Sequence, residues 1–468
     1  MMSNSRNIKQ ITRHVDAGVI HLTSETSLSS THLDIESPLS PSSSYVKSKL
    51  GKEISPDFIS AFMLAHWDNI LGPRILNVWL GTECHLTEQL FNQVCSRSLS
   101  GEMCRDTQDS FVDFKFLDLS EMDMILAGFV FVARGSSGLG VHSLSVLMPH
   151  SELGTYLEIH DLLSRCLNRT INKLRRFLHM SDTPQPDING EFVEKSRECL
   201  KMLASIYKSS LALPINLSET FLSPSHLLER EFLCRCIAAH LLTFGHSLVI
   251  GENSNRINLL ITTLALFNTK KERRCSMRIK EGCTCHHDLF VQGIVKKCND
   301  AYDLPVAQIV DSKYPVSIIN LTTRDVKQAY SYHHQRVYSP QGMAPNNELT
   351  LIPVEHSENL VLALMDELEK LPAECGVREA YICHFVLTLQ RKALALIKYV
   401  EGETNFGSTM FRSGMKKLRQ DLGIASEGDL QILLATAEKL KPGIIYFVFG
   451  DGQWSSRSND GWSSGVME

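Results

Sequence analysis

The first residues whose types allow chemistry are thiols and imidazoles between positions 275 and 298. Cysteine and histidine are the usual ligands of zinc, and paired ligands are normally two to four residues apart, because a tight turn must aim both at one ion. Cys283 and Cys285 are closer than that, and no second well-spaced pair follows. The sequence therefore favours a polar loop with incidental thiols over a metal site. The group comprises Cys275, Cys283, Cys285, His286, His287 and Cys298.

A second candidate is the corner at Gly251, where a predicted strand turns into a predicted helix. Helix N-termini bind anions such as phosphate. The segment Gly251–Arg256, GENSNR, lacks the Gly-Lys-Ser/Thr ending that places a lysine on the phosphates. We therefore expect no nucleotide, cofactor or metal bound by this chain itself. No nucleophile and base are spaced to suggest a catalytic set, so no catalytic residue is assigned.

Composition restricts the classes of function further. The 468 residues are 43% hydrophobic and 21% charged, as in a globular protein of more than one domain. A net charge of -5 gives no basic face for nucleic acid. The 13 cysteines and the absence of an apolar leader in the first ten residues predict reduced thiols in the cytoplasm. The longest apolar runs look too short for a membrane span, so membrane association is expected to be peripheral or through a partner.

The secondary structure predicted from the sequence begins with the segment Phe58–Leu80. Two apolar runs, Phe58–Trp67 and Ile75–Leu80, flank the polar corner Asp68–Arg74. Gly72 tolerates the backbone angles of a reversal, and Pro73 fixes its own φ. The segment is predicted to be a β-hairpin with a longer loop. We predict that this corner is structural; a contact with another protein is the alternative, which would be indicated by normal stability together with lost function in a Gly72 variant.

Apolar periodicity predicts an α/β chain of two modules. We expect a Ser-rich disordered extension at 1–55, a first module at 56–180, a linker at 181–224, a second module at 225–450 and a polar tail at 451–468. The first module is expected to hold a five-stranded antiparallel-type sheet with helices. After the hairpin, its predicted elements are a helix at Thr87–Val94, strands at Phe111–Leu119, Met124–Ala133 and His142–Met148, and a helix at Leu153–Leu178.

The second module is predicted to combine an α/β part with a helical C-terminal part. The stretch Tyr330–Tyr338 is interpreted as a loop, and Ser426 and Asp429 have the spacing of a capping box. The predicted helices are Ser225–Leu242, one after Gly251, Glu379–Val400 and one after Ser426; the predicted strands are Ser247–Ile250, Leu289–Val295, Val306–Val310, Val316–Leu321 and Ile444–Phe449.

Five stretches of the sequence carry a resemblance to a known family: Ala65–Arg74, Leu289–Gly293, Gln390–Tyr399, Glu427–Leu430 and Lys439–Gly443. They resemble the longin–DENN family, and within it the branch associated with amyotrophic lateral sclerosis and frontotemporal dementia. The resemblance runs in one order from about residue 58 to 450, and it identifies the chain as a divergent, invertebrate-like member. The extension before residue 55, the middle from 181 to 223, the loop around 330–353 and the tail depart from it.

The resemblance implies a longin domain followed by a DENN domain. It also implies a complex with a second longin–DENN protein, of the Smith–Magenis region candidate type, and with a WD-repeat protein. Such complexes act on small GTPases of the Rab and Arf types in autophagy, endocytosis and lysosome homeostasis. The expected location is the cytoplasm, with recruitment to lysosomes and to endosomal or autophagic membranes.

Two hypotheses about function follow from this resemblance. In the first, the chain is a non-catalytic scaffold and GTPase-docking subunit of a regulatory complex; in the second, it is a direct guanine-nucleotide exchange factor for Rab GTPases. An arginine finger stabilises transition-state charge in GTPase activation. The family attributes that arginine to the partner subunit, and Arg134, in the predicted hairpin loop, is the nearest counterpart in this chain.

The first module is also expected to supply a surface for a partner. Unpaired strand edges attract other chains, and Ile75–Leu80 is the predicted edge. Val78 and Trp79 are adjacent and must point to opposite faces of the strand. One of the two is therefore expected to lie away from the core and to contact the partner.

Overall fold

The computed structural model describes residues 45–82, 86–102, 111–135, 138–180, 187–208, 215–279, 285–296, 304–338, 348–372, 376–405, 414–424 and 426–449. All of these belong to one compact unit, Ser44–Glu468. The predictions for Cys283, Cys298, residues 1–44 and the tail at 451–468 lie outside the described residues.

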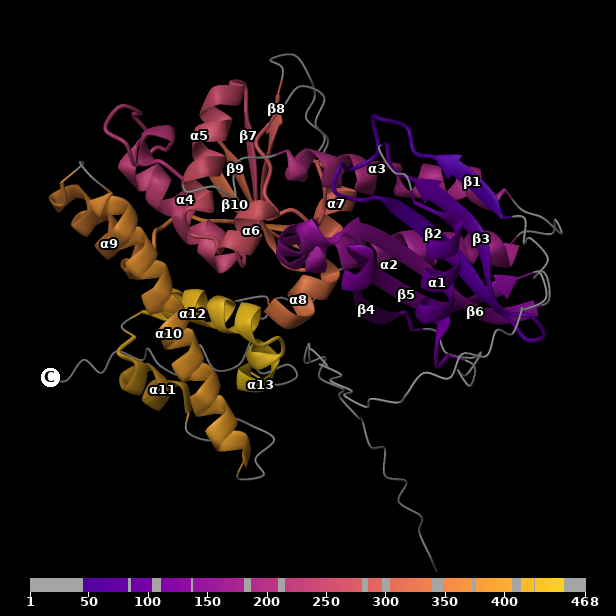
Figure 1. The fold of residues 1–468 in the computed structure, drawn as a ribbon. Helices are drawn as coiled ribbons and strands as arrows, with labels where there is room; N and C mark the ends of the chain where they lie inside the picture. Colours follow the sequence, from indigo (N-terminus) through magenta and orange to yellow (C-terminus); the bar gives the residue numbers. More distant parts are fainter. Residues whose placement is uncertain are drawn as a thin grey trace, which may run out of the picture. The chain divides into compact units, whose positions relative to one another are not determined.

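The first module contains a six-stranded sheet in the order β1-β3-β2-β6-β5-β4, which Figure 1 shows in indigo and purple. Each neighbouring pair is antiparallel except β1 and β3, which are parallel. The five predicted strands are all present. Their bounds are β2 Ala61–Asp68, β3 Gly72–Leu80, β4 Asp113–Leu119, β5 Met124–Gly135 and β6 Gly138–Pro149.

Strand β1, Val46–Lys49, was not predicted and corrects the boundary of the disordered extension. It pairs with β3 from Val46 opposite Asn77 to Lys49 opposite Leu80. After β1, Leu50 and Ile54 are buried in a hydrophobic core of the first module, which we call the first core. Residues 45–55 contain few apolar side chains, so composition alone predicted disorder. The segment is ordered because its backbone pairs with β3 and because Leu50 and Ile54 pack in the first core.

Helices cover both faces of the first sheet. Helix α1, Glu88–Leu99, begins at Thr87, whose side chain accepts a hydrogen bond from the Leu90 amide, as the sequence predicted. Helix α2, Leu153–Met180, and helix α3, Ile188–Tyr207, pack on the opposite face. Two short 3-10 turns, Ser120–Met122 and His150–Glu152, complete this module.

Helix α3 lies inside the predicted linker, yet it belongs to the first core. Its Phe192 is fully buried and stacks on Trp79, with ring centroids 4.0 Å apart. Asn189 accepts a hydrogen bond from the Trp79 indole at 2.6 Å. The part of the chain that contributes to the first core therefore extends at least to Tyr207. Apart from the end of the disordered extension, the predicted domain bounds and the separate folding of the two modules remain predictions.

The second module contains a five-stranded sheet in the order β11-β10-β9-β7-β8. The pairs β7–β8 and β7–β9 are parallel, whereas β9–β10 and β10–β11 are antiparallel. Strands β10 and β11 were not predicted. The strands are β7 Ser247–Gly251, β8 Val291–Val295, β9 Val316–Asn320, β10 Asp325–Tyr330 and β11 Thr350–Pro353; the helices of this part are α4 Arg230–Leu242, α5 Ser254–Ala265, α6 Lys270–Arg274, α7 Val306–Val310 and α8 Tyr332–Tyr338, after a 3-10 turn at Leu217–Glu219.

The C-terminal part of the second module is helical, as predicted, and Figure 1 shows it in orange and yellow. Helix α10 packs against α9, α11, α12 and α13. Its inner side contributes Ile382, Leu389 and Leu396 to the second core. The bounds are α9 Asn359–Lys370, α10 Val377–Asn405, α11 Gly414–Leu422, α12 Glu427–Leu440 and α13 Ile444–Phe449.

Two predicted strands are helices instead. Val306–Val310 forms α7, in which Ile309 is buried while Val306 and Val310, one helical turn apart, are exposed. Ile444–Phe449 forms α13, whose N-terminus is held by the carboxylate of Glu438, which accepts hydrogen bonds from the amides of Gly443 and Ile445. Both runs are short and wholly or largely apolar, so periodicity could not separate strand from helix.

The predicted loop at Tyr330–Tyr338 is also wrong. Tyr330 ends β10, and Tyr332–Tyr338 forms α8. The Ser331 hydroxyl accepts a hydrogen bond from the His334 amide, which is the usual way a serine starts a helix. The His334 ring bonds the carbonyl of Ser312 at 2.9 Å. His334 thus has a structural role in the described fold.

Half of the predicted capping box at the start of α12 is confirmed. The Ser426 hydroxyl accepts a hydrogen bond from the Asp429 amide at 3.0 Å. The Asp429 carboxylate accepts instead from the Leu360 amide at 2.9 Å, in the first turn of α9. Asp429 therefore links the beginnings of two helices.

Helix α10 corrects the expectation about membrane-length segments. Within the described part of the chain, Val377–Gly402 is the one helix long and apolar enough to cross a membrane by length and composition. Core helices of other folds pass the same test. One side of α10 is packed in the second core, as described above, so the helix is an integral element of this module.

A buried carboxylate joins the two modules. Asp288 precedes β8, and its side chain is 2% exposed. Arg165 of α2 donates to it at 3.0 Å, and Arg169 of the same helix pairs with its other oxygen. Nearby, Cys275, Met277 and Leu289 of the second module lie in the core that α2 builds. The α2 helix is therefore fixed to both modules by ionic and apolar contacts.

Candidate functional site

Two hairpin tips lie side by side at one end of the first sheet. Strands β2 and β6 are neighbours and run antiparallel, with His66 opposite His142. The end of β2 at Asp68 therefore lies beside the beginning of β6 at Gly138. The β2–β3 turn and the Gly135–Gly138 end of the β5–β6 ladder consequently lie at the same end of the sheet. We call this surface the two-hairpin tip, formed by residues 67–74 and by Arg134, Leu139 and Gly140.

The β2–β3 turn is held by its own side chain. One oxygen of Asp68 accepts hydrogen bonds from the amides of Ile70 and Leu71, at 2.8 and 2.9 Å. The bond from Leu71 and then the bond from Ile70 are the main reasons why the pKa of Asp68 is lowered. Gly72 has a φ of +78° and pairs with Asp68, so the strand resumes immediately after the turn. The loop is shorter than the predicted Asp68–Arg74 corner.

This hydrogen-bonded turn presents apolar side chains to solvent. Ile70 is 92% exposed and Leu71 is 60% exposed. On the neighbouring hairpin, Leu139 is 60% exposed. Three large aliphatic side chains are therefore exposed at this end of the sheet, which makes it a candidate for contact with another protein. The sequence indicated the first corner but gave no sign of Leu139, because its exposure depends on where the β5–β6 turn falls.

The tip also carries positive charge. Arg134 is exposed on β5 and lies directly opposite Leu139 in the β5–β6 ladder. Among the described residues, neither Arg134 nor Arg74 forms an ion pair with a carboxylate. The structure thus places Arg134 on β5 rather than in the predicted hairpin loop, at the same end of the sheet as the corner at Asp68–Arg74 but separated from it by β6. Its role as an arginine finger remains a prediction.

Behind the tip, a row of rings supports the two hairpins. His66 and His142 lie 6.0 Å apart between ring centroids, and Phe131 stacks on His142 at 5.8 Å. The His142 ring donates to the Gly140 carbonyl at 2.9 Å. Burial lowers the pKa of His142 to about 4 and also lowers the pKa of His66. These imidazoles are therefore neutral packing groups at physiological pH.

Replacing Gly72 with valine should destabilise the first module by about 1–3 kcal/mol, because a β-branched residue is strained at positive φ. No atom lies within 4 Å of the position that a Cβ would occupy, so strain alone is responsible. Chemical denaturation measures the effect. Gly140→Val is the control, since Gly140 is equally open but lacks a positive φ. Equal stability of the two variants would contradict the strained turn.

The predicted interface residues Val78 and Trp79 are both fully buried. They do point to opposite faces, but Val78 packs in the core beneath α1 and Trp79 in the core beneath α2 and α3. Strand β3 is not an edge, because β1 and β2 flank it. The argument that one side chain must lie outside the core is therefore wrong, since helices cover both faces. A direct contact by either residue has no support in this geometry.

The other candidates from the sequence are structural where they are described. Among the described residues, no group of three or more His, Cys, Asp or Glu side chains could hold a metal ion. Cys275 is buried in the first core. At the Gly251 corner, the side chain of Asn253 caps α5. A Cβ on Gly251 would lie 3.3 Å from Ile257, so the glycine allows close packing.

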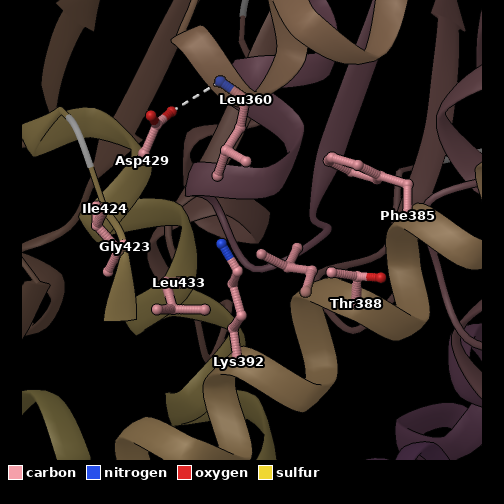
Figure 2. A pocket seen from close by; sticks show the side chains of 9 residues that line it. Leu360, Phe385, Thr388, Lys392, Gly423, Ile424, Asp429 and Leu433 are labelled. Carbon is pink, nitrogen blue, oxygen red and sulfur yellow. Dashed lines mark hydrogen bonds between the residues drawn. The ribbon is translucent and has the colours of Figure 1, made fainter. Parts of the chain in front are cut away.

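A small cavity lies in the helical part of the second module. It measures about 70 Å³ and is lined by α9, α10 and α12 and by the turn after α11. Figure 2 shows Asp429 bonded to the Leu360 amide, with Phe385, Leu433 and Lys392 around the hollow. Because Asp429 already caps α9, the cavity is explained by helix packing. The two-hairpin tip is therefore the better candidate for a functional site.

The two modules, in this order, define a longin–DENN protein. The first has the strand–strand–helix–three-strand–helix order of a longin domain, and the second has the α/β part followed by helices of a DENN domain. The model of the C9orf72-like protein family matches residues 93–335. The chain belongs to the C9orf72-like family.

Three curated relatives extend the similarity over most of the chain. The mouse protein named guanine nucleotide exchange factor C9orf72 homolog is 30% identical over 468 residues, covering 88% of this chain and 95% of the relative. The human protein of the corresponding name is 29% identical over 465 residues, and the rat protein is 29% identical over 468. The coverage is the same for both.

A solved structure, the longin domain of Lst4 from K. lactis, also matches. The match covers 30% of this chain and 92% of that domain, at 13% identity and a TM-score of 0.23.

Proposed function

We propose that this chain regulates a small GTPase of the Rab or Arf type by docking it on the two-hairpin tip. Relatives that cover nearly the whole chain are named guanine nucleotide exchange factors, which supports a GTPase as the partner. The observation that carries the docking site is the exposure of Ile70, Leu71 and Leu139 at one end of the sheet. Arg134 and Arg74 add charge for a carboxylate or phosphate on the partner.

The tip is suited to binding because it loses little conformational freedom on association. The Asp68 hydrogen bonds and Gly72 fix the turn in advance, so little backbone freedom remains to be lost. Burying a large aliphatic side chain contributes about 1.5–3 kcal/mol. Three such side chains offset part of the free-energy cost of association, and the remaining contacts with the partner must supply the rest. An arginine beside them supplies orientation through charge-assisted hydrogen bonds.

Docking of a GTPase on this chain is compatible with two forms of GTPase regulation. In the form we favour, the chain is a non-catalytic scaffold of a complex with a second longin–DENN protein and a WD-repeat protein. In the alternative, it is a direct exchange factor, which the names of the relatives favour. Exchange requires only stabilisation of the nucleotide-free GTPase, so neither form needs a nucleophile or a metal.

Nucleotide release and GTP hydrolysis, measured with the purified chain alone and with its longin–DENN partner, separate the two forms. The scaffold predicts no acceleration by the chain alone and a change of either rate only with the partner. Faster release caused by the isolated chain establishes the exchange factor. No effect under either condition would contradict both forms.

The partner longin–DENN protein is proposed to pair with strand β4. Since β1 covers β3, β4 is the edge that the described part of the sheet leaves unpaired next to an apolar surface. Phe114 and Phe116 are 41% and 38% exposed there. Phe116 stacks on Tyr156 of α2 at 5.3 Å. The heterodimerisation surface expected on β3 is thereby relocated to the opposite edge.

Phe116→Lys should reduce co-purification of a longin–DENN partner by about tenfold or more, because a charged edge residue opposes strand addition. A smaller loss of thermal stability is expected, since Phe116 is partly exposed already. Lys47→Glu on β1 is the control at the other edge and should leave co-purification unchanged. If Lys47→Glu releases the partner and Phe116→Lys does not, the partner binds β1. Val78→Pro is unsuitable, because it would disrupt an interior strand.

The cellular setting is part of the same proposal. A GTPase regulator of this family would act in autophagy, endocytosis and lysosome homeostasis. It would reside in the cytoplasm and reach lysosomal or endosomal membranes through its partners.

A further inference from the structure

Helix α10 is more apolar than its packing requires. Only 28% of the most apolar window in Val377–Gly402 is buried inside the protein. The buried residues of this helix are Ile382, Leu389, Ala393, Leu396, Ile397 and Val400, and Phe385 and Val386 pack partly buried against the same core. A second apolar stripe therefore faces outward along the same helix.

The outward stripe follows helical spacing. Leu387 and Leu394, two turns apart, are each 49% exposed, and Val377 is 40% exposed. Ala380, Cys383 and Ala395 are exposed between or beside them. Positions spaced by three, four and seven residues lie along one face of a helix. This face is the kind of surface on which a second amphipathic helix packs. We call it the outer face of α10.

The charges on the outer face have one sign. Arg391 is four residues after Leu387, and Lys398 is four residues after Leu394, so the cations alternate with the leucines along the same face of the helix. Both are exposed. The sequence from Ala380 to Val400 contains no aspartate or glutamate. Neither Arg391 nor Lys398 forms an ion pair with a carboxylate among the described residues.

We propose that the outer face of α10 binds an acidic amphipathic helix of a partner protein. The apolar stripe would receive leucine-type side chains at coiled-coil spacing, and Arg391 and Lys398 would receive flanking carboxylates. A second copy of this chain fits less well, because the same two cations would face one another across a two-fold axis. The proposal does not depend on the GTPase or on the two-hairpin tip.

A designed peptide tests the proposal on the full chain. The probe is a fluorescent helix of about three heptads with leucine at a and d and glutamate at e and g. Fluorescence anisotropy should give a dissociation constant of about 10–100 μM. A second peptide with lysine in place of glutamate should bind about tenfold more weakly or not at all. Equal binding of the two peptides would overturn the charge complementarity.

Variants locate the binding. The pair Leu387→Asp and Leu394→Asp, and separately the pair Arg391→Glu and Lys398→Glu, should each weaken the glutamate peptide by about tenfold or more. Leu362→Asp on α9, an exposed leucine outside the outer face, is the matched control and should have no effect. Unchanged melting temperatures show that the variants remain folded. Binding that survives both double variants would overturn the proposed site.

A lipid surface is the alternative ligand of the outer face, and a separate experiment tests it. Vesicles of phosphatidylcholine with about 30% phosphatidylserine would be sedimented with the chain. The proposal predicts no retention that depends on Leu387 and Leu394. Vesicle binding lost in the Leu387→Asp, Leu394→Asp variant, together with no peptide binding, would show that the outer face is a membrane contact instead.

Discussion

An Ile70→Asp chain is expected to fold normally and to lose regulation of its GTPase. Ile70 is 92% exposed, so the substitution removes almost no packing within the chain. In a docked complex the same change deletes a buried aliphatic contact of about 1.5–3 kcal/mol and adds a charge that must be desolvated. Affinity for the GTPase should fall by about 100-fold or more. Biolayer interferometry with an immobilised GTPase, in its nucleotide-free and GTP-bound forms, measures this loss.

Leu227→Asp is the matched control for Ile70→Asp. Leu227 is 87% exposed and lies before α4 in the second module. Both variants place a carboxylate at a solvent-exposed aliphatic position, so they share any effect of charge alone. Loss of binding in both, or in neither, would show that the two-hairpin tip is not the docking site.

The second large effect is expected at Asp288. Asp288→Ala should lower the free energy of unfolding by about 2–4 kcal/mol, because it leaves Arg165 and Arg169 without their shared carboxylate. This loss lies toward the lower end of the range typical of a broken buried ion pair. The reason is that the two arginine side chains are 28% and 31% exposed and become partly hydrated when the carboxylate is removed. Urea denaturation followed by tryptophan fluorescence measures the change.

An exposed ion pair provides the comparison for Asp288. Glu219 pairs with Arg278 at 2.6 Å, and the glutamate side chain is 58% exposed. Glu219→Ala should therefore have a much smaller effect. A wild-type unfolding curve for Asp288→Ala would mean that the ionic junction between α2 and the second module contributes little. A curve that splits into two transitions would instead show that Asp288 couples the unfolding of the two modules.

Long elements with a repeating pattern could be predicted from the sequence. The leucines of α2 recur at helical spacing over many turns, and β5 is a continuous apolar run bounded by turns. Short apolar runs could not be assigned in this way. Ile444–Phe449 is rich in strand-forming residues, yet the buried Glu438 carboxylate holds its first amides in a helix. That contact arises only from tertiary structure, and no local pattern contains it.

The sequence drew attention to two parts of the candidate site but not to their assembly. It predicted the corner at Asp68–Arg74 to be a structural turn and named Arg134 as the nearest counterpart of an arginine finger. Their proximity depends on the register of β6 between β2 and β5, which the sequence does not specify. The same register decides that Leu139 lies opposite Arg134. The prediction that β3 is an edge strand failed for a related reason, because the covering strand β1 lies in a segment whose composition predicted disorder.

Hydrogen–deuterium exchange with and without a bound Rab or Arf GTPase tests the central claim most directly. A panel of GTPases would first be screened, and the one bound most tightly would be used. Docking on the two-hairpin tip predicts slower exchange in peptides covering residues 66–74 and 134–142 on addition of the GTPase. Slower exchange confined to the second module, with these two hairpins unchanged, would contradict the proposed site.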